Sequence, residues 1–187
     1  MKKEKSKGRE NSIPITEIQG PIGVVDECSL RQRYQELTRL LIEKECTITS
    51  MESCTSGLLA SLITDEEGSS MIFKGSFVAY SNEAKVLMGV PCEIIAQYGV
   101  YSAETAVAMA EVSRSAFQTD IAVGVTGTFG NADPSNADST PGEVFFAIAS
   151  EKGISCFHCV VPEQPTRLAY KLYMASIIRD ALKKTLR

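Results

Sequence analysis

A run of small hydroxyl residues stands where a predicted strand gives way to an apolar helix. Ser53 lies in the stretch MESCTSGLLASLIT, residues 51–64, between a β-branched segment over 47–51 and an apolar segment with helical spacing. A serine at such a junction is either a helix cap or a nucleophile, because unpaired backbone N–H groups at a helix start can stabilise an oxyanion. The residues that would supply those N–H groups are Cys54, Thr55, Ser56 and Gly57.

A tyrosine and a lysine follow the next predicted strand, over residues 73–80. Tyr80 ends that strand, and Lys85 lies in the first turn of the helix that follows. A partly desolvated lysine beside another polar group loses its proton near neutral pH, and it can then activate a serine without a histidine. Because His158 is the single histidine, we expect any catalysis here to proceed without a histidine base. The alternative is that Lys85 is an ordinary surface lysine.

A glycine-rich segment follows a third predicted strand, over residues 121–125. The stretch GVTGTFG, residues 124–130, resembles a phosphate-binding turn and opens a polar loop over 127–142 that is long for a compact domain. It lacks the G-x-G-x-x-G pattern and lies far from the first strand, which argues against a dinucleotide fold. In α/β folds, these three stretches would gather at the C-terminal ends of the strands.

The cysteines and the histidine do not form a pattern typical of a metal site. Six cysteines are scattered along the chain, which favours free thiols over a disulfide framework. Residues 154–161 have the pattern of a strand, which places Cys156 and His158 on one face and Cys159 on the other. A four-ligand site would need a second cluster, and the sequence contains none. We therefore expect no metal and no cofactor.

The composition narrows the class of protein. The 187 residues suggest one domain, and a hydrophobic content of 44% suffices for a sizeable core. A net charge of −4 argues against nucleic acid as the main partner. No apolar stretch approaches the roughly 20 residues that span a bilayer, and the N-terminus lacks the apolar region of a secretory signal. We expect a cytoplasmic protein that binds a small molecule and neither nucleic acid nor membrane, and we leave open whether it forms a homo-oligomer.

The remaining pattern predicts the elements that position these residues. Residues 1–28 are rich in charge, proline and glycine, which predicts a charged or irregular arm, and the stretch SLRQ, residues 29–32, fits a capping box. Further helices are expected after Ser81, Pro91 and Ser102 and over 167–185, with two more strands over 143–150 and 154–161. This order predicts a three-layer α/β/α sandwich with a mixed β-sheet, formed by a single domain over 29–187.

Taken together, these stretches resemble the C-terminal domain of the CinA family (competence-damage-inducible protein A). The resemblance runs from about residue 30 to 185, and its two most specific motifs are ESCT, residues 52–55, and YSNEAK, residues 80–85. Other matching positions are Gly57, the Gly-Ser-Ser of 68–70, Val78 and Ala79, Gly89 and Val90, Gly99 with Ser102, and Thr126 with Gly127. The family includes stand-alone nicotinamide mononucleotide deamidases, and we expect this chain to lack the N-terminal pyrophosphatase domain of full-length CinA proteins.

The resemblance implies an amidohydrolase that converts nicotinamide mononucleotide to nicotinate mononucleotide and ammonia, without a metal. Ser53 would attack the carboxamide carbon, Lys85 would take its proton, and Tyr80 would relay that proton or orient the lysine. The backbone N–H groups after Ser53 would hold the oxyanion. The expected substrate-binding residues are Asn82, Thr126, Gly127, Thr128, Gly130 and Arg167.

The chain departs from the family pattern where a nucleotide would bind. Ser56 replaces the first of two glycines, and the loop Gly-Ile-Ala-Gly-Pro-Gly-Gly becomes GTFGNAD, residues 127–133. The family's Gly-Thr becomes Gly142-Glu143, and its Gly-Asp-Arg becomes Pro-Glu-Gln over 162–164, which leaves Arg167 as the nearest cation.

These changes affect the expected phosphate site. Glu143 and Asp133 would repel a phosphate, whereas backbone N–H groups over 127–130 would form an anion-binding nest. Two alternatives to the nucleotide deamidase stay open. One is a related amidase that acts on another small amide, and the other is a nucleotide-binding or regulatory protein without turnover.

Overall fold

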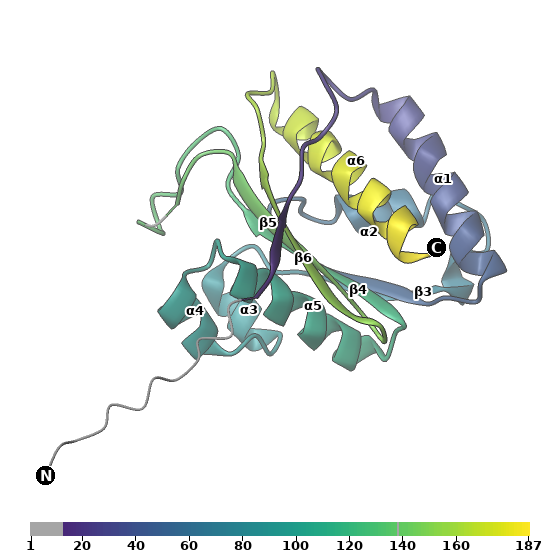
Figure 1. Cartoon of the computed structure of the whole chain (residues 1–187), viewed down its shortest axis with the longest axis horizontal. Helices are drawn as coiled ribbons and strands as arrows, with labels where there is room; N and C mark the ends of the chain where they lie inside the picture. The colour runs from purple at the N-terminus through teal and green to yellow at the C-terminus, as the bar shows by residue number, and fades with distance from the viewer. Residues whose placement is uncertain (1–12, 138) are drawn as a thin grey trace, which may run out of the picture.

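The computed structural model describes residues 13–137 and 139–187 as a six-stranded mixed sheet between two layers of helices (Figure 1). The strand order is β1-β6-β5-β4-β2-β3, in which β5 runs antiparallel to both β4 and β6 and the other pairs are parallel. The α/β/α sandwich predicted from the sequence is therefore confirmed. The strands are β1 (Ile15–Glu17), β2 (Ile48–Glu52), β3 (Phe73–Val78), β4 (Ile121–Gly127), β5 (Glu143–Ser150) and β6 (Gly153–Val160).

Three helices cover each face of the sheet. One layer holds α1 (Glu27–Glu43), α2 (Leu58–Ile63) and α6 (Arg167–Thr185), and the other holds α3 (Asn82–Leu87), α4 (Cys92–Tyr98) and α5 (Ala103–Phe117) (Figure 1). A single 3-10 turn, η1 (Ser69–Met71), precedes β3. Because both faces are covered, every residue of β2 and β4 is buried. None of the helices that the structure describes is long and apolar enough to cross a membrane.

Small residues bring α5 close to the centre of the sheet. A Cβ atom added to Gly124 of β4 would lie 2.2 Å from the Ala106 carbonyl oxygen and 2.5 Å from the Ala110 nitrogen of α5. Only a glycine at 124 allows this approach. The start of α5 is thereby placed beside the end of β4, where Thr126 Oγ1 donates to the Val100 carbonyl at 2.8 Å.

The structure differs at the N-terminus from the irregular arm expected over residues 1–28. Residues 15–17 form β1, which pairs in parallel with β6, and the Glu17 carboxylate hydrogen-bonds His158 Nδ1 at 2.9 Å. Helix α1 begins earlier than the expected capping box, because Asp26 is its N-cap and accepts from the Ser29 nitrogen at 2.8 Å. The charged start of the arm, residues 1–12, lies outside the described residues.

Candidate active site

Ser53 lies directly after β2, in a tight turn rather than in the first turn of a helix. Its nitrogen donates to the Val125 carbonyl at 3.1 Å, which continues the pairing with β4. Helix α2 begins only at Leu58, and both residues before it have left-handed backbone, with φ of 54° at Ser56 and 87° at Gly57. Glycine adopts this conformation without strain. Gly57 therefore fits its position, whereas Ser56 adopts a conformation that residues other than glycine rarely take.

Glu52 holds this turn in place. Its fully buried carboxylate accepts from the backbone N–H groups of Gly57 at 3.0 Å, Leu59 at 3.1 Å and Ala60 at 3.0 Å. The last two belong to the first turn of α2, where N–H groups lack intrahelical partners. The carboxylate therefore caps α2 from a position six residues upstream, at the end of β2. No local sequence rule signals a cap at that distance.

Two of the four expected oxyanion donors are available. The Ser56 nitrogen donates to the Ser53 carbonyl at 3.0 Å and the Gly57 nitrogen donates to Glu52, so these two N–H groups are occupied, contrary to the prediction. Within residues 13–137 and 139–187, the N–H groups of Cys54 and Thr55 have no protein acceptor. The part of the predicted oxyanion site that remains is therefore formed by Cys54 and Thr55.

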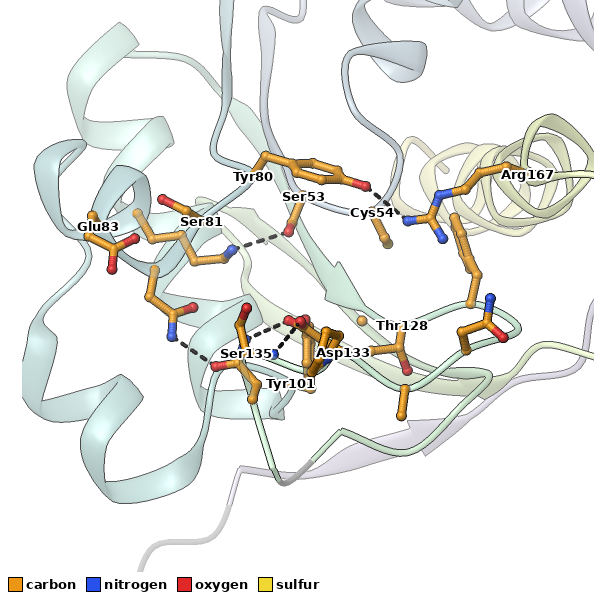
Figure 2. A pocket seen from close by; sticks show the side chains of 18 residues that line it. Ser53, Cys54, Tyr80, Ser81, Glu83, Tyr101, Thr128, Asp133, Ser135 and Arg167 are labelled. Carbon is orange, nitrogen blue, oxygen red and sulfur yellow. Dashed lines mark hydrogen bonds between the residues drawn. The ribbon is translucent and has the colours of Figure 1, made fainter.

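Lys85 reaches Ser53 from helix α3, as predicted. Its Nζ atom lies 3.1 Å from Ser53 Oγ, a contact drawn as a dashed line in Figure 2. The same atom lies 3.0 Å from the Ala79 carbonyl oxygen. Only 1% of Lys85 and 6% of Ser53 is exposed. Burial lowers the pKa of Lys85 from its ordinary 10.5 to about 8, because desolvation disfavours the ammonium form. A substantial fraction of this lysine is therefore neutral near pH 8 and can accept the serine proton.

Tyr80 does not join this pair. It is 59% exposed, and its hydroxyl accepts a hydrogen bond from Arg167 Nη2 at 2.9 Å (Figure 2). Lys85 is oriented instead by the carbonyl of Ala79, the residue before Tyr80. In the part of the chain that the structure describes, the Tyr80 hydroxyl bonds to neither Ser53 nor Lys85. The predicted role of Tyr80 as proton relay or lysine-orienting group is not what this geometry shows.

These side chains line a cavity of about 510 Å³ at the C-terminal ends of β2 and β4. Of the predicted substrate-binding residues, Asn82, Gly127, Thr128 and Arg167 line this cavity, whereas Thr126 and Gly130 do not. Thr126 is buried within β4, and its hydroxyl donates to the Val100 carbonyl instead of facing the cavity. A Cβ atom on Gly130 would lie 2.6 Å from Tyr170 Oη, so this glycine makes room for helix α6.

The first half of the anion-binding nest expected over 127–130 is taken up by the sheet. Strand β4 continues to Gly127, and the Thr128 nitrogen donates to the Glu143 carbonyl at 2.9 Å. This N–H group therefore extends the sheet instead of pointing at a ligand. Among the described residues that line the cavity, the cationic side chain other than Lys85 is Arg167, the first residue of α6.

The polar loop between β4 and β5 is attached to the helices beside the cavity. The Asp133 carboxylate accepts from Tyr101 Oη and from Asn136 Nδ2, and Asn136 Oδ1 accepts in turn from Asn82 Nδ2 at 2.9 Å. The bond from Tyr101 is the main cause that lowers the pKa of Asp133. Asp133 thus places a negative charge in the cavity wall, as predicted, whereas Glu143 does not line the cavity.

The Cys156–Cys159 region of β6 is arranged as the strand pattern predicts. Cys156 belongs to the apolar cluster on the α5 side of the sheet, and Cys159 belongs to the cluster on the opposite side. His158 stacks on Phe145, with ring centroids 4.6 Å apart, and bonds to Glu17. Among the described residues, no three His, Cys, Asp or Glu side chains are grouped so that they could hold a metal ion.

The fold and the site together define a three-layer α/β/α protein with a buried serine–lysine pair where parallel strands end. The chain belongs to the CinA family, because the sequence model of the CinA C-terminal domain matches residues 30–185.

Two relatives show the extent of the sequence match. The chain is 45% identical over 121 residues to a CinA-like protein of Flavobacterium psychrophilum, an alignment that covers 63% of this chain and 28% of that protein. It is 43% identical over 120 residues to a CinA-like protein of Geobacter sulfurreducens, with 64% of this chain and 29% of that protein covered. The chain therefore matches less than a third of the length of either relative.

Solved structures show the same fold. The competence/damage inducible protein CihA of Agrobacterium tumefaciens superposes with a TM-score of 0.73 at 26% identity, covering 84% of this chain and 93% of that chain. A CinA superfamily protein of Enterobacter cloacae gives a TM-score of 0.76 at 21% identity, covering 84% and 92% of the two chains. At such low identity, the second likeness shows the fold alone.

Proposed function

We propose that this chain is an amidohydrolase that cleaves the carboxamide of nicotinamide mononucleotide, with Ser53 as nucleophile and Lys85 as general base. The observation that carries the proposal is the 3.1 Å contact between Ser53 Oγ and Lys85 Nζ. A serine hydroxyl is a weak nucleophile until a base takes its proton. Lys85 fits that task because its pKa of about 8 leaves part of it neutral.

Acylation begins when neutral Lys85 removes the Ser53 proton as Oγ bonds to the carboxamide carbon. The carbonyl electron pair moves onto oxygen, where the N–H groups of Cys54 and Thr55 stabilise the negative charge. Collapse of this intermediate breaks the C–N bond, and the Lys85 ammonium gives its proton to the departing nitrogen. Ammonia leaves, Lys85 is neutral again, and the acyl group remains on Ser53.

Deacylation repeats the sequence with water as the nucleophile. Lys85 takes a proton from the water as its oxygen bonds to the acyl carbon. Collapse then breaks the C–Oγ bond, and the proton returns from Lys85 to Ser53. The products are nicotinate mononucleotide and a regenerated enzyme.

Three features support a mononucleotide as the substrate. The cavity of about 510 Å³ is in the range of small-molecule sites. Arg167 supplies a cation at its rim for a phosphate, and the motifs shared with nicotinamide mononucleotide deamidases surround the serine. One observation favours a second candidate, an amidase acting on a small amide without phosphate: the Asp133 carboxylate in the cavity wall opposes an anion.

Ammonia release separates these candidates. The purified protein is incubated with nicotinamide mononucleotide, nicotinamide riboside and nicotinamide, and the Ser53→Ala variant serves as the blank for contaminating amidases. We expect the highest kcat/KM for the mononucleotide. Preference for the riboside or free nicotinamide would favour the second candidate, and binding without ammonia release would favour a non-catalytic role.

A further inference from the structure

Tyr80 and Arg167 form a bridge at the rim of the cavity. Tyr80 follows β3 and Arg167 opens α6, yet Arg167 Nη2 donates to Tyr80 Oη at 2.9 Å. Figure 2 shows the tyrosine ring extending over the Ser53 turn, with its hydroxyl directed at the guanidinium. Both side chains line the same cavity as Ser53 and Lys85. The bridge therefore lies beside the nucleophile but does not contact it.

A second contact, with the ring of Phe129, also restricts the guanidinium. The Arg167 Cζ atom lies 5.4 Å from the centroid of the Phe129 ring, within the range of a cation–π interaction. Phe129 is only 1% exposed and stacks on Tyr170, with ring centroids 5.1 Å apart. A rigid aromatic surface and the Tyr80 hydroxyl thus hold an otherwise exposed arginine in one orientation.

This orientation leaves donors for a ligand. A guanidinium carries five N–H bonds in a planar fork, and Tyr80 uses one of them. The others match the oxygens of a phosphate, which arginine binds in bidentate fashion.

We propose that Tyr80 is a positioning residue for Arg167, and that the two side chains together select substrates with a terminal phosphate monoester. The inference rests on the proposed amidohydrolase function and gives Tyr80 a role in substrate selection instead of proton transfer. It also gives the site a means to recognise an anion despite the Asp133 carboxylate in its wall and although the Thr128 N–H group is bonded within the sheet. Without the tyrosine hydroxyl, binding of a phosphate must itself order the arginine side chain, which weakens the complex.

Steady-state kinetics of Tyr80→Phe with two substrates tests this role. For nicotinamide mononucleotide we expect KM to rise about three- to tenfold with kcat nearly unchanged, since ordering one long side chain opposes binding by that much. For nicotinamide riboside, which lacks the phosphate, we expect both constants to stay within about twofold. Tyr98→Phe, at an exposed tyrosine outside the cavity, is the matched control and should change neither substrate.

A double-mutant cycle distinguishes positioning from catalysis. Arg167→Ala should raise KM for the mononucleotide at least tenfold, and Tyr80→Phe should add nothing in that background, because the tyrosine acts through the arginine. A fall in kcat for both substrates on Tyr80→Phe, persisting in the Arg167→Ala background, would show that Tyr80 takes part in proton transfer and would overturn the inference.

Calorimetric titration in the Ser53→Ala background separates this inference from the proposed function. The same contrast between mononucleotide and riboside should appear in Kd. If the wild type releases no ammonia but the contrast in Kd is present, the amidohydrolase proposal fails and the anion-selecting bridge stands. If ammonia is released but Tyr80→Phe weakens both ligands equally, the bridge has no selective role and only the amidohydrolase proposal stands.

Discussion

The serine–lysine contact depends on keeping an amine in a place where its charged form is disfavoured. Lys85 has two polar partners, Ser53 Oγ and the Ala79 carbonyl, and neither carries a formal charge. Its pKa falls from 10.5 to about 8, a change that corresponds to about 3 kcal/mol at 1.36 kcal/mol per unit. At neutral pH this amount is lost from the free energy of unfolding. The buried lysine can, however, act as a base without a histidine.

The pH dependence of the reaction follows from this pKa. Lys85 is an active base only when neutral, so kcat/KM should rise about tenfold per pH unit below pH 8 and level off above about pH 8. Rates of ammonia release between pH 6 and 10 measure this profile. Lys85→Arg, which stays protonated throughout, should lose at least about a hundredfold in activity. A profile that is flat, or that bends near pH 6, would mean that another group is the base.

Of the contacts that single residues make in the site, some were predictable from local sequence and others were not. The approach of Lys85 to Ser53 was predictable, because both follow neighbouring parallel strands at the same edge of the sheet. The partner of Tyr80 was not, because Arg167 comes from a helix 87 residues away and meets it only after the whole sheet has formed. The hydrogen bond from Tyr101 to Asp133 was not predictable either, because it forms only when the polar loop folds against the start of α5.

At the scale of elements, α2 is too short to be stable by itself. It spans six residues, Leu58–Ile63, and has no side-chain cap at Gly57. The Glu52 carboxylate supplies that cap from the preceding strand, and Ser53 is the next residue along the chain. The position of Ser53 therefore depends on the hydrogen bonds between Glu52 and the first turn of α2.

Glu52→Gln should therefore impair both folding and catalysis. The amide keeps the shape but loses the charge, and its NH₂ group faces backbone donors, so we expect a loss of about 2–3 kcal/mol in the free energy of unfolding. At a temperature where the variant is fully folded, kcat should fall at least about tenfold while KM changes less. Urea denaturation and steady-state kinetics measure the two effects. Ser50→Ala, which removes a 3.2 Å contact to Glu52 and a 2.7 Å contact to Ser76, leaves the three backbone bonds of Glu52 in place and is the control, with an expected cost of about 1 kcal/mol. Equal losses in the two variants would refute the capping role.

The contact between α5 and the sheet depends on the missing side chain at Gly124. Gly124→Ala would place a methyl group 2.2 Å from the Ala106 carbonyl oxygen, so α5 must move away. Overpacking of this kind costs about 1–3 kcal/mol, which chemical denaturation measures. Glu111→Ala, on the exposed side of the same helix, should stay within about 0.5 kcal/mol of the wild type. If Gly124→Ala is as stable as that control, the close approach does not govern the packing.

Most elements were predictable from hydrophobic period and cap residues. The strand over 143–150 and the helix over 167–185 have the expected bounds, and Ser81 and Ser102 cap the helices that they were expected to open. Strand β1 escaped prediction because three exposed residues have no pattern of their own and pair only with distant β6. The extension of β4 through Gly127 has the same cause, since its partner Val144 lies beyond the long polar loop.

At the scale of the whole molecule, the strand order gathers the site. Parallel β3, β2 and β4 end on the same side of the sheet, which brings Lys85, Ser53 and Thr128 together. Strand β5 runs back antiparallel to β4, and β6 runs antiparallel to β5, so the chain returns to that side, where Arg167 begins α6. The cavity is therefore formed by segments that span most of the domain. A ligand that bridges these segments should stabilise the entire fold.

The inactive Ser53→Ala variant allows that stabilisation to be measured. It keeps Lys85, Arg167 and the cavity walls, so nicotinamide mononucleotide should bind without being consumed. At a ligand concentration about 100 times Kd, binding adds about 2.7 kcal/mol to the stability of the folded state. For a chain of 187 residues that gain corresponds to a rise in Tm of roughly 5–10 °C, which differential scanning calorimetry detects.

Nicotinamide riboside at the same concentration should produce a smaller shift because it lacks the phosphate that Arg167 would bind, and ribose 5-phosphate is the control for the phosphate alone. If the mononucleotide leaves the Tm of this variant unchanged, or if ribose 5-phosphate raises the Tm equally, the site does not hold the nicotinamide ring against residue 53.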